Sequence, residues 1–419
     1  MTPSSALVPS LAGAAWLFDG PAARVLAMLD RDGEEARVVG GAVRNALMGQ
    51  PPGDIDIATT ATPDEVTRRA HAAGLKPVPT GLDHGTVTVV ADGVGIEVTT
   101  LRQDVETDGR RAMVAFGRDW EADARRRDFT INAFSADRTG HVYDPIGGFD
   151  DLARRRVRFI GDPVTRIRED YLRILRFFRF HAGYGVGAPD AAGLTACLAE
   201  RAGLAKLSRE RIRLELLKLF KAAGAGATLE VMADTGLIHA VLGGIADAAA
   251  FSRLAAIESA RGLAPDPVRR LAVLAVRIEE DAARLHDRLR LANDETRRLT
   301  RIAAHWRHAA AMTVVEARTL LYRLGAPDYR DVVLAALALS GEAAAAPGWA
   351  DRLDLPQRWT PPPCPIKAAD LMARGLKPGP ALGRALAQAE AAWIAAGFPL
   401  APDAIGRIVG AAAGLGSPE

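Results

Sequence analysis

The chain has 419 residues, of which 49% are hydrophobic and 25% charged, as in an ordinary globular protein of roughly two to four domains. A net charge of +2 excludes attraction of nucleic acid through an overall basic field, so any such surface must be local. No uncharged apolar run reaches the length of a transmembrane helix, about 18 residues, and the first residues lack the basic region of a signal peptide. Cys197 and Cys364 are far apart and lack metal-ligand spacing. Two cysteines in a chain of this length fit a reducing, cytoplasmic location.

The first predicted elements form a candidate phosphate site. After a flexible lead and a helix over 21–29, residues 37–39 are predicted as a short apolar strand, Gly40 and Gly41 as a tight turn, and residues 42–48 as a helix. Glycines at a helix start let backbone N–H groups approach a phosphate, helped by the helix dipole. Arg44, one turn further on, adds a charged fork to the same phosphate. The alternative is an ordinary turn before a helix.

Two aspartates follow this helix. After the Pro51-Pro52-Gly53 break, residues 54–58 are predicted as a second strand, whose period of two places Asp54 and Asp56 on one face. Two neighbouring carboxylates repel each other, and a divalent cation that prefers oxygen ligands, such as Mg²⁺, relieves that repulsion. A lone Asp-x-Asp is more often a solvated strand edge, but beside a phosphate site the pair predicts a metal centre.

The next elements extend a mixed α and β region. A helix is predicted over 62–74, and strands over 86–90 and 95–100 are joined by a hairpin turn at Asp92-Gly93. In the second of these strands, Glu97 is either a third metal carboxylate or a solvent-facing glutamate, and we leave it unassigned.

A polar connection and a basic motif come next. Residues 102–124 are long for a connection, which indicates a functional or mobile loop. Residues 125–133 have the sequence Arg-Arg-Arg-Asp-Phe-Thr-Ile-Asn-Ala. Arg127 is suited to grip a triphosphate, and Asp128 is suited to accept from a ribose 2′-OH, which selects NTP over dNTP. A basic helix start on the surface is the alternative.

From residue 163 onward strand signals disappear and helices are predicted to the end of the chain. Asp170, Arg173 and Arg176 recur every three residues, so we expect one stripe on a helix. Cytosine and adenine both present an amino donor beside a ring-nitrogen acceptor; Asp170 can accept from the amine and Arg173 can donate to the ring nitrogen. Uracil and guanine reverse this polarity and leave polar groups unpaired. A solvated stripe with ion pairs within the helix is the alternative.

Three of these motifs together resemble those of a known family. Three stretches are similar to the motifs of class II template-independent nucleotidyltransferases. The first is Gly-Gly-x-x-Arg-Asn-x-Leu-x-Gly with Asp-x-Asp-x-Ala, the second is Arg-Arg-Asp-Phe-Thr-Ile-Asn-Ala, and the third is Glu-Asp-x-x-Arg-x-x-Arg. The members of this family are the CCA-adding enzymes (tRNA nucleotidyltransferases) and the bacterial poly(A) polymerases, within the polymerase-beta superfamily. The resemblance covers residues 38–218 strongly and a tail segment, 366–380, weakly.

The resemblance implies a role for each matching residue. Catalysis and metal binding fall to Asp54 and Asp56, and base reading to Asp170 and Arg173. The implied nucleotide-binding residues are Gly41, Arg44, Arg127, Asp128, Asp170, Arg173, Arg176 and Arg179. The segment 102–124 corresponds to a flexible loop needed for the switch to adding A. Residues 207–218 resemble a structural neck motif, and we expect them to lie outside the active site.

The expected fold is an α/β nucleotidyltransferase (polymerase-beta-like) head followed by an all-α neck, body and tail. The expected divisions are an N-terminal lead and helix (1–30), the head (31–150), a neck with the base-reading helix (151–225), and a tRNA-binding body and tail (226–419).

The expected activity is that of a CCA tRNA nucleotidyltransferase, which adds C, C and A to tRNA 3′ ends from CTP and ATP, without a nucleic-acid template and with release of pyrophosphate. Two Mg²⁺ ions are expected at Asp54 and Asp56. The expected partners are the tRNA 3′ end, CTP and ATP, with no membrane, and no feature predicts an oligomeric state. One alternative, a bacterial poly(A) polymerase, is disfavoured because no strongly basic C-terminal extension is present. The other, a catalytically silent RNA-binding relative, is disfavoured by the intact aspartates.

Overall fold

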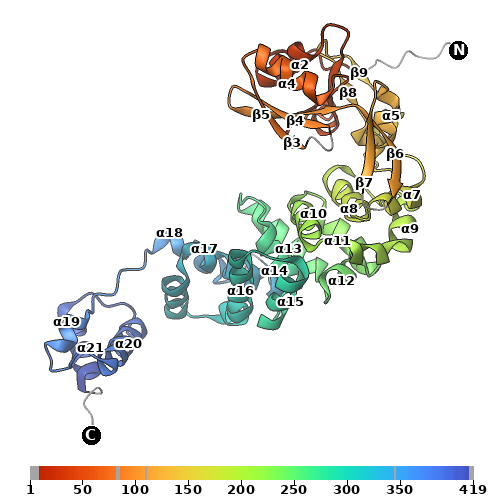
Figure 1. Cartoon of the computed structure of the whole chain (residues 1–419). Coiled ribbons are helices and arrows are strands. Elements are labelled where there is room, and N and C mark those ends of the chain that lie inside the picture. The colour runs from red at the N-terminus through yellow and green to blue at the C-terminus, as the bar shows by residue number, and fades with distance from the viewer. Residues whose placement is uncertain (1–8, 82–84, 109–110, 344–345, 415–419) are drawn as a thin grey trace. The chain divides into compact units, whose positions relative to one another are not determined.

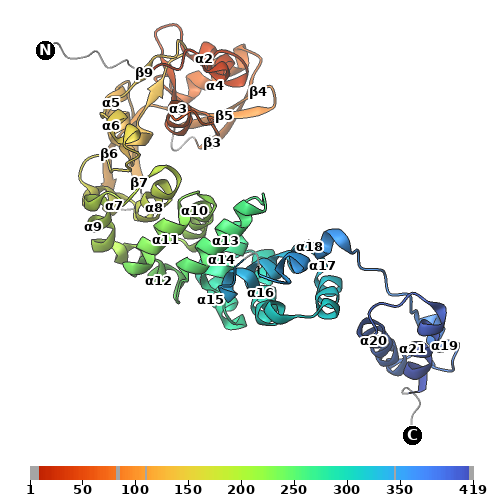
Figure 2. The same cartoon turned by 180° about the vertical axis from the view of Figure 1, so that it is seen from behind.

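The structure is a computed structural model that describes residues 9–81, 85–108, 111–343 and 346–414. The chain divides into two compact units, Met1–Thr228 and Leu229–Glu419, which we describe in turn. The elements of the first unit are coloured red to green in Figures 1 and 2, and those of the second green to blue. Among the described residues all strands lie in the first unit, and the second is helical.

The first unit begins with a seven-stranded mixed sheet in the order β3-β4-β5-β2-β1-β8-β9. Strand β2 runs parallel to β5, and the other neighbouring strands are antiparallel. Along β4 buried and half-buried residues alternate, because successive side chains point to opposite faces. The strands are β1 (Ala36–Val39), β2 (Asp56–Thr59), β3 (Lys76–Gly81), β4 (Thr86–Ala91), β5 (Val94–Thr100), β8 (Ser135–Ala136) and β9 (Val142–Tyr143).

Helices α2 (Pro21–Leu29) and α4 (Pro63–Ala72) both pack against β4 and β5 and against each other. The α4 start has the predicted cap: the Thr62 hydroxyl accepts from the Glu65 amide over 3.4 Å, and proline follows the cap directly. The smaller helices of the head are α1 (Ala15–Phe18), α3 (Gly41–Leu47), α5 (Trp120–Arg125) and α6 (Phe149–Ala153).

Strand β2 starts later than the sequence predicts. It begins at Asp56, which is paired with Val39 of β1 and Glu97 of β5. Asp54 lies in a bend two residues earlier and is exposed. The preceding Pro51-Pro52-Gly53 explains the shift, because proline has no N–H for a ladder and Gly53 has a φ of +71°. The predicted strand is therefore wrong for Asp54, although Asp54 and Asp56 still line one cavity together.

The segment 102–124, predicted as a loop, forms regular structure. Its backbone makes a separate antiparallel hairpin of β6 (Arg102–Asp108) and β7 (Arg111–Phe116), followed by α5. Arg102 is paired with Phe116 at the base of the hairpin. A segment of this length satisfies its backbone N–H and C=O groups by pairing with itself, which composition alone did not indicate.

Helices of the neck follow the head within the same unit. They are α7 (Pro163–Glu169), α8 (Leu172–Tyr184), α9 (Ala191–Ala199) and α10 (Arg209–Lys221), and α11 (Ala225–Asp234) continues into the second unit. Helix α8 packs against α10. Its Phe177 ring lies 5.5 Å from Phe159, which in turn lies 4.9 Å from Phe129 of the basic motif, measured between ring centroids. This aromatic contact fixes α8 against the head.

Asp170 lies between two helices. Helix α7 ends at Glu169, and Asp170 has an extended backbone with φ −153° and ψ 106°. Its Oδ1 accepts from the Leu172 amide over 3.1 Å, at the start of α8. The predicted single stripe is therefore wrong for Asp170, because this aspartate supplies a side-chain acceptor to a helix start instead of continuing the helix.

The second unit consists of helices around an apolar core. Buried segments include Leu271–Ala275 of α14 and Val332–Ala338 of α17. Helix α17 is interrupted at Gly325, with φ +76°, and Pro327 follows. The helices are α12 (Leu237–Leu242), α13 (Ala248–Ala260), α14 (Pro267–Ala275), α15 (Glu279–Leu289), α16 (Asn293–Ala311), α17 (Val314–Ser340), α18 (Trp349–Arg358), α19 (Ala368–Met372), α20 (Pro380–Ala395) and α21 (Pro402–Gly414).

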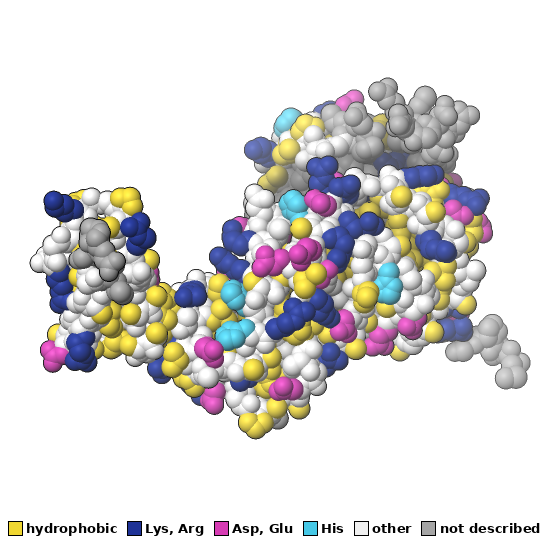
Figure 3. Space-filling model, turned by 90° about the horizontal axis from the view of Figure 1, so that it is seen from below, with side chains coloured by type: hydrophobic (Ala, Val, Ile, Leu, Met, Phe, Trp, Pro, Cys, Tyr) yellow, Lys and Arg dark blue, Asp and Glu magenta, His cyan; other side chains and the backbone are white. Residues whose placement is uncertain are grey.

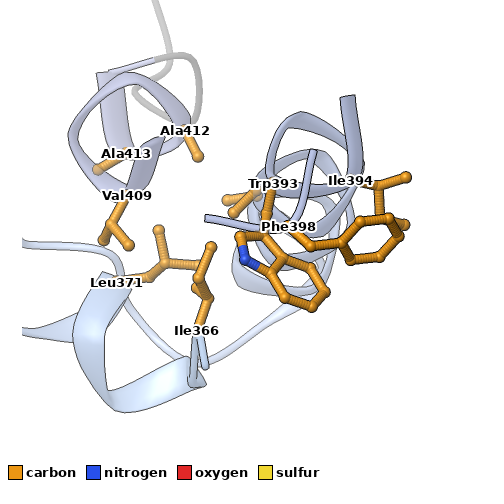
Figure 4. Packing of buried hydrophobic residues seen from close by; sticks show 10 residues of the cluster. Ile366, Leu371, Trp393, Ile394, Phe398, Val409, Ala412 and Ala413 are labelled. Carbon is orange, nitrogen blue, oxygen red and sulfur yellow. The ribbon is translucent and has the colours of Figure 1, made fainter. Parts of the chain in front are cut away.

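The last three helices have their own small core. Trp393 and Phe398 lie at its centre, with ring centroids 5.0 Å apart, and the side chains of Ile366, Leu371 and Val409 surround them (Figure 4).

On the molecular face seen in Figure 3, Lys and Arg side chains occur in separate groups with Asp and Glu between them. No helix in the part of the chain that the structure describes has both the length and the apolar character needed to cross a bilayer. The predicted fold class, an α/β head followed by helical parts, is confirmed.

Candidate active site

One polar pocket of about 470 Å³ contains most of the residues that the sequence singles out. It lies within the first unit and is formed by the start of α3, the first residue of β2, the basic motif, α8 and α10. Its lining residues are Gly40, Gly41, Arg44, Asp56, Arg126, Arg127, Asp128, Asn132, Asp170, Leu172, Arg173, Arg176, Arg179, Phe180 and Arg211. Every predicted nucleotide-binding residue is in this set, and so is Asp56.

The turn before α3 forms one wall of the pocket. Gly40 has a φ of +69°, a backbone conformation that side chains rarely adopt. A Cβ at this position would lie 3.2 Å from Nη1 of Arg127. The Arg127 guanidinium donates from Nη2 to Asp123 over 3.1 Å, which holds it beside the glycine turn. The start of α3 and the Arg127 guanidinium thus line the same wall of the pocket, an arrangement suited to a phosphate.

The carboxylates lie at the sheet end of the pocket. Asp56 also lines a second cavity of about 480 Å³, together with Asp54 and Glu97. Burial and the neighbouring charges of Glu97 and Asp54 raise the pKa of Asp56 to about 6, although Arg127 opposes the shift. Within the described residues no three His, Cys, Asp or Glu side chains form a ready-made metal cluster. Carboxylate oxygens suit a divalent cation that completes its coordination with water and substrate phosphates.

Asp128 is buried and both of its oxygens have partners. Oδ1 accepts from the Phe129 amide over 2.9 Å and from Nδ2 of Asn132 over 3.0 Å. Oδ2 accepts from Nε and Nη2 of Arg176, at 2.8 and 2.5 Å. Burial opposes the charged form, but Arg176 and the other donors outweigh it and hold the pKa of Asp128 below its ordinary value. The carboxylate is therefore an ionised acceptor at neutral pH.

Arg44 is also buried, which is unusual for a predicted phosphate contact. Its Nη1 donates to Oδ1 of Asn132, and its Nε and Nη2 donate to Oδ1 of Asn45 at 3.2 and 2.9 Å. Nη2 donates in addition to the Tyr184 hydroxyl over 2.6 Å. Most of its donors are thus committed within the protein. The expectation that the Arg44 guanidinium is free to bind a phosphate is therefore wrong for this conformation.

The predicted base-reading residues lie at the neck side of the pocket. Oδ2 of Asp170 accepts from Nη2 of Arg211 over 2.7 Å. Nη1 of Arg173 donates to the Arg166 carbonyl over 2.8 Å and to Glu169 over 2.5 Å. Arg211 belongs to α10, so the expectation that residues 207–218 lie outside the site is wrong.

Glu215 of α10 holds the last two arginines. The side chain of Arg179 donates through Nε to Glu215, and Nη1 of Arg176 lies 3.8 Å from the same carboxylate. The Arg179 guanidinium also lies 4.1 Å from the centre of the Phe180 ring. Glu215 and Arg211 are one helical turn apart, and this spacing in the sequence could have indicated one shared helix face.

Two sequence-family models match the chain. The first, described as the poly A polymerase head domain, matches residues 36–158, and the second, described as a probable RNA and SrmB-binding site of polymerase A, matches residues 194–248. The CCA tRNA nucleotidyltransferase 1 of Danio rerio, named as mitochondrial, is 35% identical over 88% of this chain and 85% of its own length. The chain belongs to the CCA tRNA nucleotidyltransferase family.

Further family members support the assignment. The CCA-adding enzyme of Geobacillus thermodenitrificans is 41% identical, over 55% of this chain and 56% of its own length. The crystal structure of the Bacillus stearothermophilus CCA-adding enzyme in complex with CTP superimposes with a TM-score of 0.71 and 29% identity, covering 89% of this chain and 91% of that one. The Thermotoga maritima CCA-adding enzyme complexed with tRNA shares the fold, with a TM-score of 0.69 and 18% identity, covering 96% of this chain and 98% of that one.

Membership of the CCA tRNA nucleotidyltransferase family confirms the resemblance on which the sequence analysis relied and makes this chain a nucleotidyltransferase. Five pocket residues had no predicted role, namely Arg126, Asn132, Leu172, Phe180 and Arg211. Asn132 stands inside the quoted basic motif, and its position there was the available signal.

Proposed function

We propose that this protein adds C, C and A to the 3′ end of tRNA from CTP and ATP, without a nucleic-acid template. The observation that carries the proposal is one pocket that joins Asp56, the glycine turn with Arg127, the buried Asp128 and the pair of Asp170 and Arg173. Asp56 suits a metal, and the glycine turn with Arg127 suits a triphosphate. Asp128 suits a ribose, and the pair of Asp170 and Arg173 suits a base. Relatives with the names CCA-adding enzyme and CCA tRNA nucleotidyltransferase support the same assignment.

The reaction is a nucleotidyl transfer. The 3′-hydroxyl oxygen of the tRNA forms a bond to the α-phosphorus of the NTP, the bond from that phosphorus to the bridging oxygen of the β-phosphate breaks, and pyrophosphate leaves. The hydroxyl proton passes to solvent. Arg127 and the start of α3 at the Gly40–Gly41 turn hold the triphosphate in line for this displacement, because the guanidinium lies beside this turn in the pocket wall.

Asp54 and Asp56 are proposed to hold two Mg²⁺ ions. The chemistry of the donors fits, because burial and the neighbouring charges of Glu97 and Asp54 raise the pKa of Asp56, and a cation relieves the repulsion between these charges. When bound, such ions activate the attacking hydroxyl and neutralise charge on the triphosphate. The protein's part is to keep both carboxylates in one cavity at the start of β2, where Asp56 also lines the pocket of Arg127 and the glycine turn.

Base choice is proposed to rest on Asp170 and Arg173. Asp170 accepts from the amino group of cytosine or adenine, and Arg173 donates to the adjacent ring nitrogen. Both side chains are half-buried in the pocket wall, where an unpaired polar group of uracil or guanine would be costly. Arg211, which already donates to Asp170, fixes the direction of this carboxylate.

The remaining proposals concern location and organisation. A cytoplasmic location fits two free cysteines, Cys197 and Cys364. We also propose that the lead (1–30), head (31–150), neck (151–225) and tRNA-binding body and tail (226–419) are the functional divisions of the chain.

The decisive experiment uses tRNA transcripts that end before, within and after C-C-A, incubated with CTP, ATP or both in the presence of Mg²⁺. Product lengths should increase only as far as the terminal A. Long A tails would indicate a poly(A) polymerase instead, and tRNA binding without extension would indicate a silent RNA-binding relative.

A further inference from the structure

Tyr184, the last residue of α8, lies directly against Arg44 of the head. The centre of its ring lies 3.7 Å from Cζ of Arg44, and its hydroxyl accepts from Nη2 of Arg44 over 2.6 Å. The ring also stacks on Phe180, one turn earlier in α8, at 5.9 Å and 28°. A phenol thus supports the buried guanidinium both through its ring face and through its oxygen.

The contact continues from Arg44 into the basic motif. Nη1 of Arg44 donates to Oδ1 of Asn132, and Nδ2 of Asn132 donates to Oδ1 of Asp128 over 3.0 Å. Oδ2 of Asp128 accepts from Nε of Arg176 over 2.8 Å. Because Arg176 and Tyr184 both belong to α8, the helix holds both ends of this chain of contacts, at points about 12 Å apart along its axis.

The orientation of the Asn132 amide depends on Arg44. An asparagine side chain has an acceptor oxygen and a donor nitrogen, which a rotation by half a turn exchanges. Since the oxygen is bound by Arg44, the nitrogen must face Asp128. If Arg44 moved away, the amide would be free to turn its oxygen towards the carboxylate, and two acceptors would then face each other.

We propose that Tyr184 is a positioning residue for sugar selection. It holds Arg44, which orients Asn132, and Asn132 orients Asp128 as the acceptor for the ribose 2′-OH. This inference rests on the proposed function, which assigns the ribose to Asp128. Arg173 and Asp170 are outside the chain of contacts, so Tyr184 should affect the choice of sugar and not the choice of base.

The test is single addition to a tRNA that ends in C-C, with kcat and KM measured separately for ATP and dATP, in the wild type, Tyr184→Phe and Tyr184→Leu. Removal of the hydroxyl loses one hydrogen bond to a charged donor, so in Tyr184→Phe the ATP-to-dATP ratio of kcat/KM should fall about tenfold. In Tyr184→Leu, which also lacks the ring, this ratio should fall further. The CTP-to-UTP ratio, measured on a tRNA that lacks all three terminal nucleotides, should stay at the wild-type value in both.

Tyr143 supplies matched control variants. Its ring lies 3.7 Å from Cζ of Arg37, and its hydroxyl donates to Asp137 over 2.9 Å, so it makes the same kind of stack outside the pocket of Asp128. Tyr143→Phe and Tyr143→Leu should lower the melting temperature to an extent similar to that of the corresponding Tyr184 variants. They should leave the ATP-to-dATP ratio of kcat/KM unchanged. If Tyr184→Leu does not fold, Tyr184→Phe, which keeps the ring, decides the question.

Two negative results are distinguishable. A wild-type enzyme that uses ATP and dATP equally well overturns the assignment of Asp128, and this inference with it. A wild-type preference for ATP that is retained in Tyr184→Phe, with Tyr184 and Tyr143 variants losing only stability, overturns the role of Tyr184 alone.

Discussion

Arg211 donates from Nη2 to Oδ2 of Asp170 over 2.7 Å, although the two residues are 41 positions apart in the sequence. The other oxygen of Asp170 accepts from the Leu172 amide, so the carboxylate is fixed between the start of α8 and the side of α10. A base that enters the pocket therefore meets an acceptor whose direction is already set. The lone pairs that remain on both oxygens are the ones available to an amino group.

The first prediction concerns base choice. Asp170→Asn replaces a carboxylate by an amide that can donate, and an amide can face the carbonyl oxygen of uracil or guanine. The variant should add CTP and ATP more slowly and begin to use UTP and GTP, with discrimination reduced roughly 5- to 150-fold, as for one good base contact. Single-nucleotide addition with each of the four NTPs measures this. Arg173→Ala is the companion variant and should weaken CTP and ATP alike without new substrates; full wild-type selectivity in Asp170→Asn would place base reading elsewhere.

A second prediction follows from the Arg211 contact. Arg211→Ala removes the cation that directs Asp170 and leaves the Leu172 amide as the partner that the structure shows. The KM for CTP and for ATP should rise about tenfold, since a hydrogen bond between charged groups is lost. Arg209→Ala, at the start of the same helix but outside the pocket lining, is the control. Equal kinetics in the two variants would show that Arg211 has no part in nucleotide binding.

The metal pair gives a third prediction. Asp54→Ala and Asp56→Ala should each reduce addition of both C and A by at least about a thousandfold, because loss of metal-ion stabilisation costs several kcal/mol in the transition state. Binding of tRNA, measured by filter retention, should persist. Asp64→Ala, an exposed aspartate of α4 outside both cavities, should keep full activity. Near-normal turnover of either aspartate variant at saturating Mg²⁺ contradicts the assignment.

A fourth prediction concerns the sugar contact. Asp128→Asn keeps the shape of the side chain but removes the charge that Arg176 and a ribose hydroxyl both need. Use of ATP should fall and the ATP-to-dATP ratio should shrink about tenfold, as for one hydrogen bond to a charged group. Steady-state measurements of kcat/KM with ATP and with dATP, made in parallel, test this prediction. An unchanged ratio would leave Asp128 with a structural role only.

The fifth prediction concerns stability of the second unit. Asp331 of α17 is buried and accepts from Nε of Arg269 and from Nε of Arg298, each at 2.8 Å. Asp331→Ala should destabilise the unit by about 1–3 kcal/mol, because two buried donors lose this acceptor while Arg269 keeps Glu258 and Arg298 keeps Asp266. Asp294→Ala breaks an exposed ion pair with Arg297 and should cost less than about 1 kcal/mol. Thermal unfolding of both variants tests the contrast, and equal melting temperatures would contradict it.

Local patterns determined much of this protein in advance. The glycine turn at Gly40, the cap at Thr62 and the helical remainder after residue 163 depend on neighbours within a few positions, so periodicity and residue type were sufficient. The motifs also pointed to the pocket, because Gly41, Arg127 and Asp128, which come from two separate motifs, all line it.

Tertiary packing alone decided the partners of those residues. Arg44 meets Tyr184 across 140 positions, and Asp170 meets Arg211 from a different helix. Spacing along one helix cannot indicate such contacts, because they depend on how α8 and α10 pack on each other and on the head. For the same reason Asp54 fell outside β2: strand ends are set by pairing with β1 and β5, and the Pro51-Pro52-Gly53 backbone cannot join that pairing.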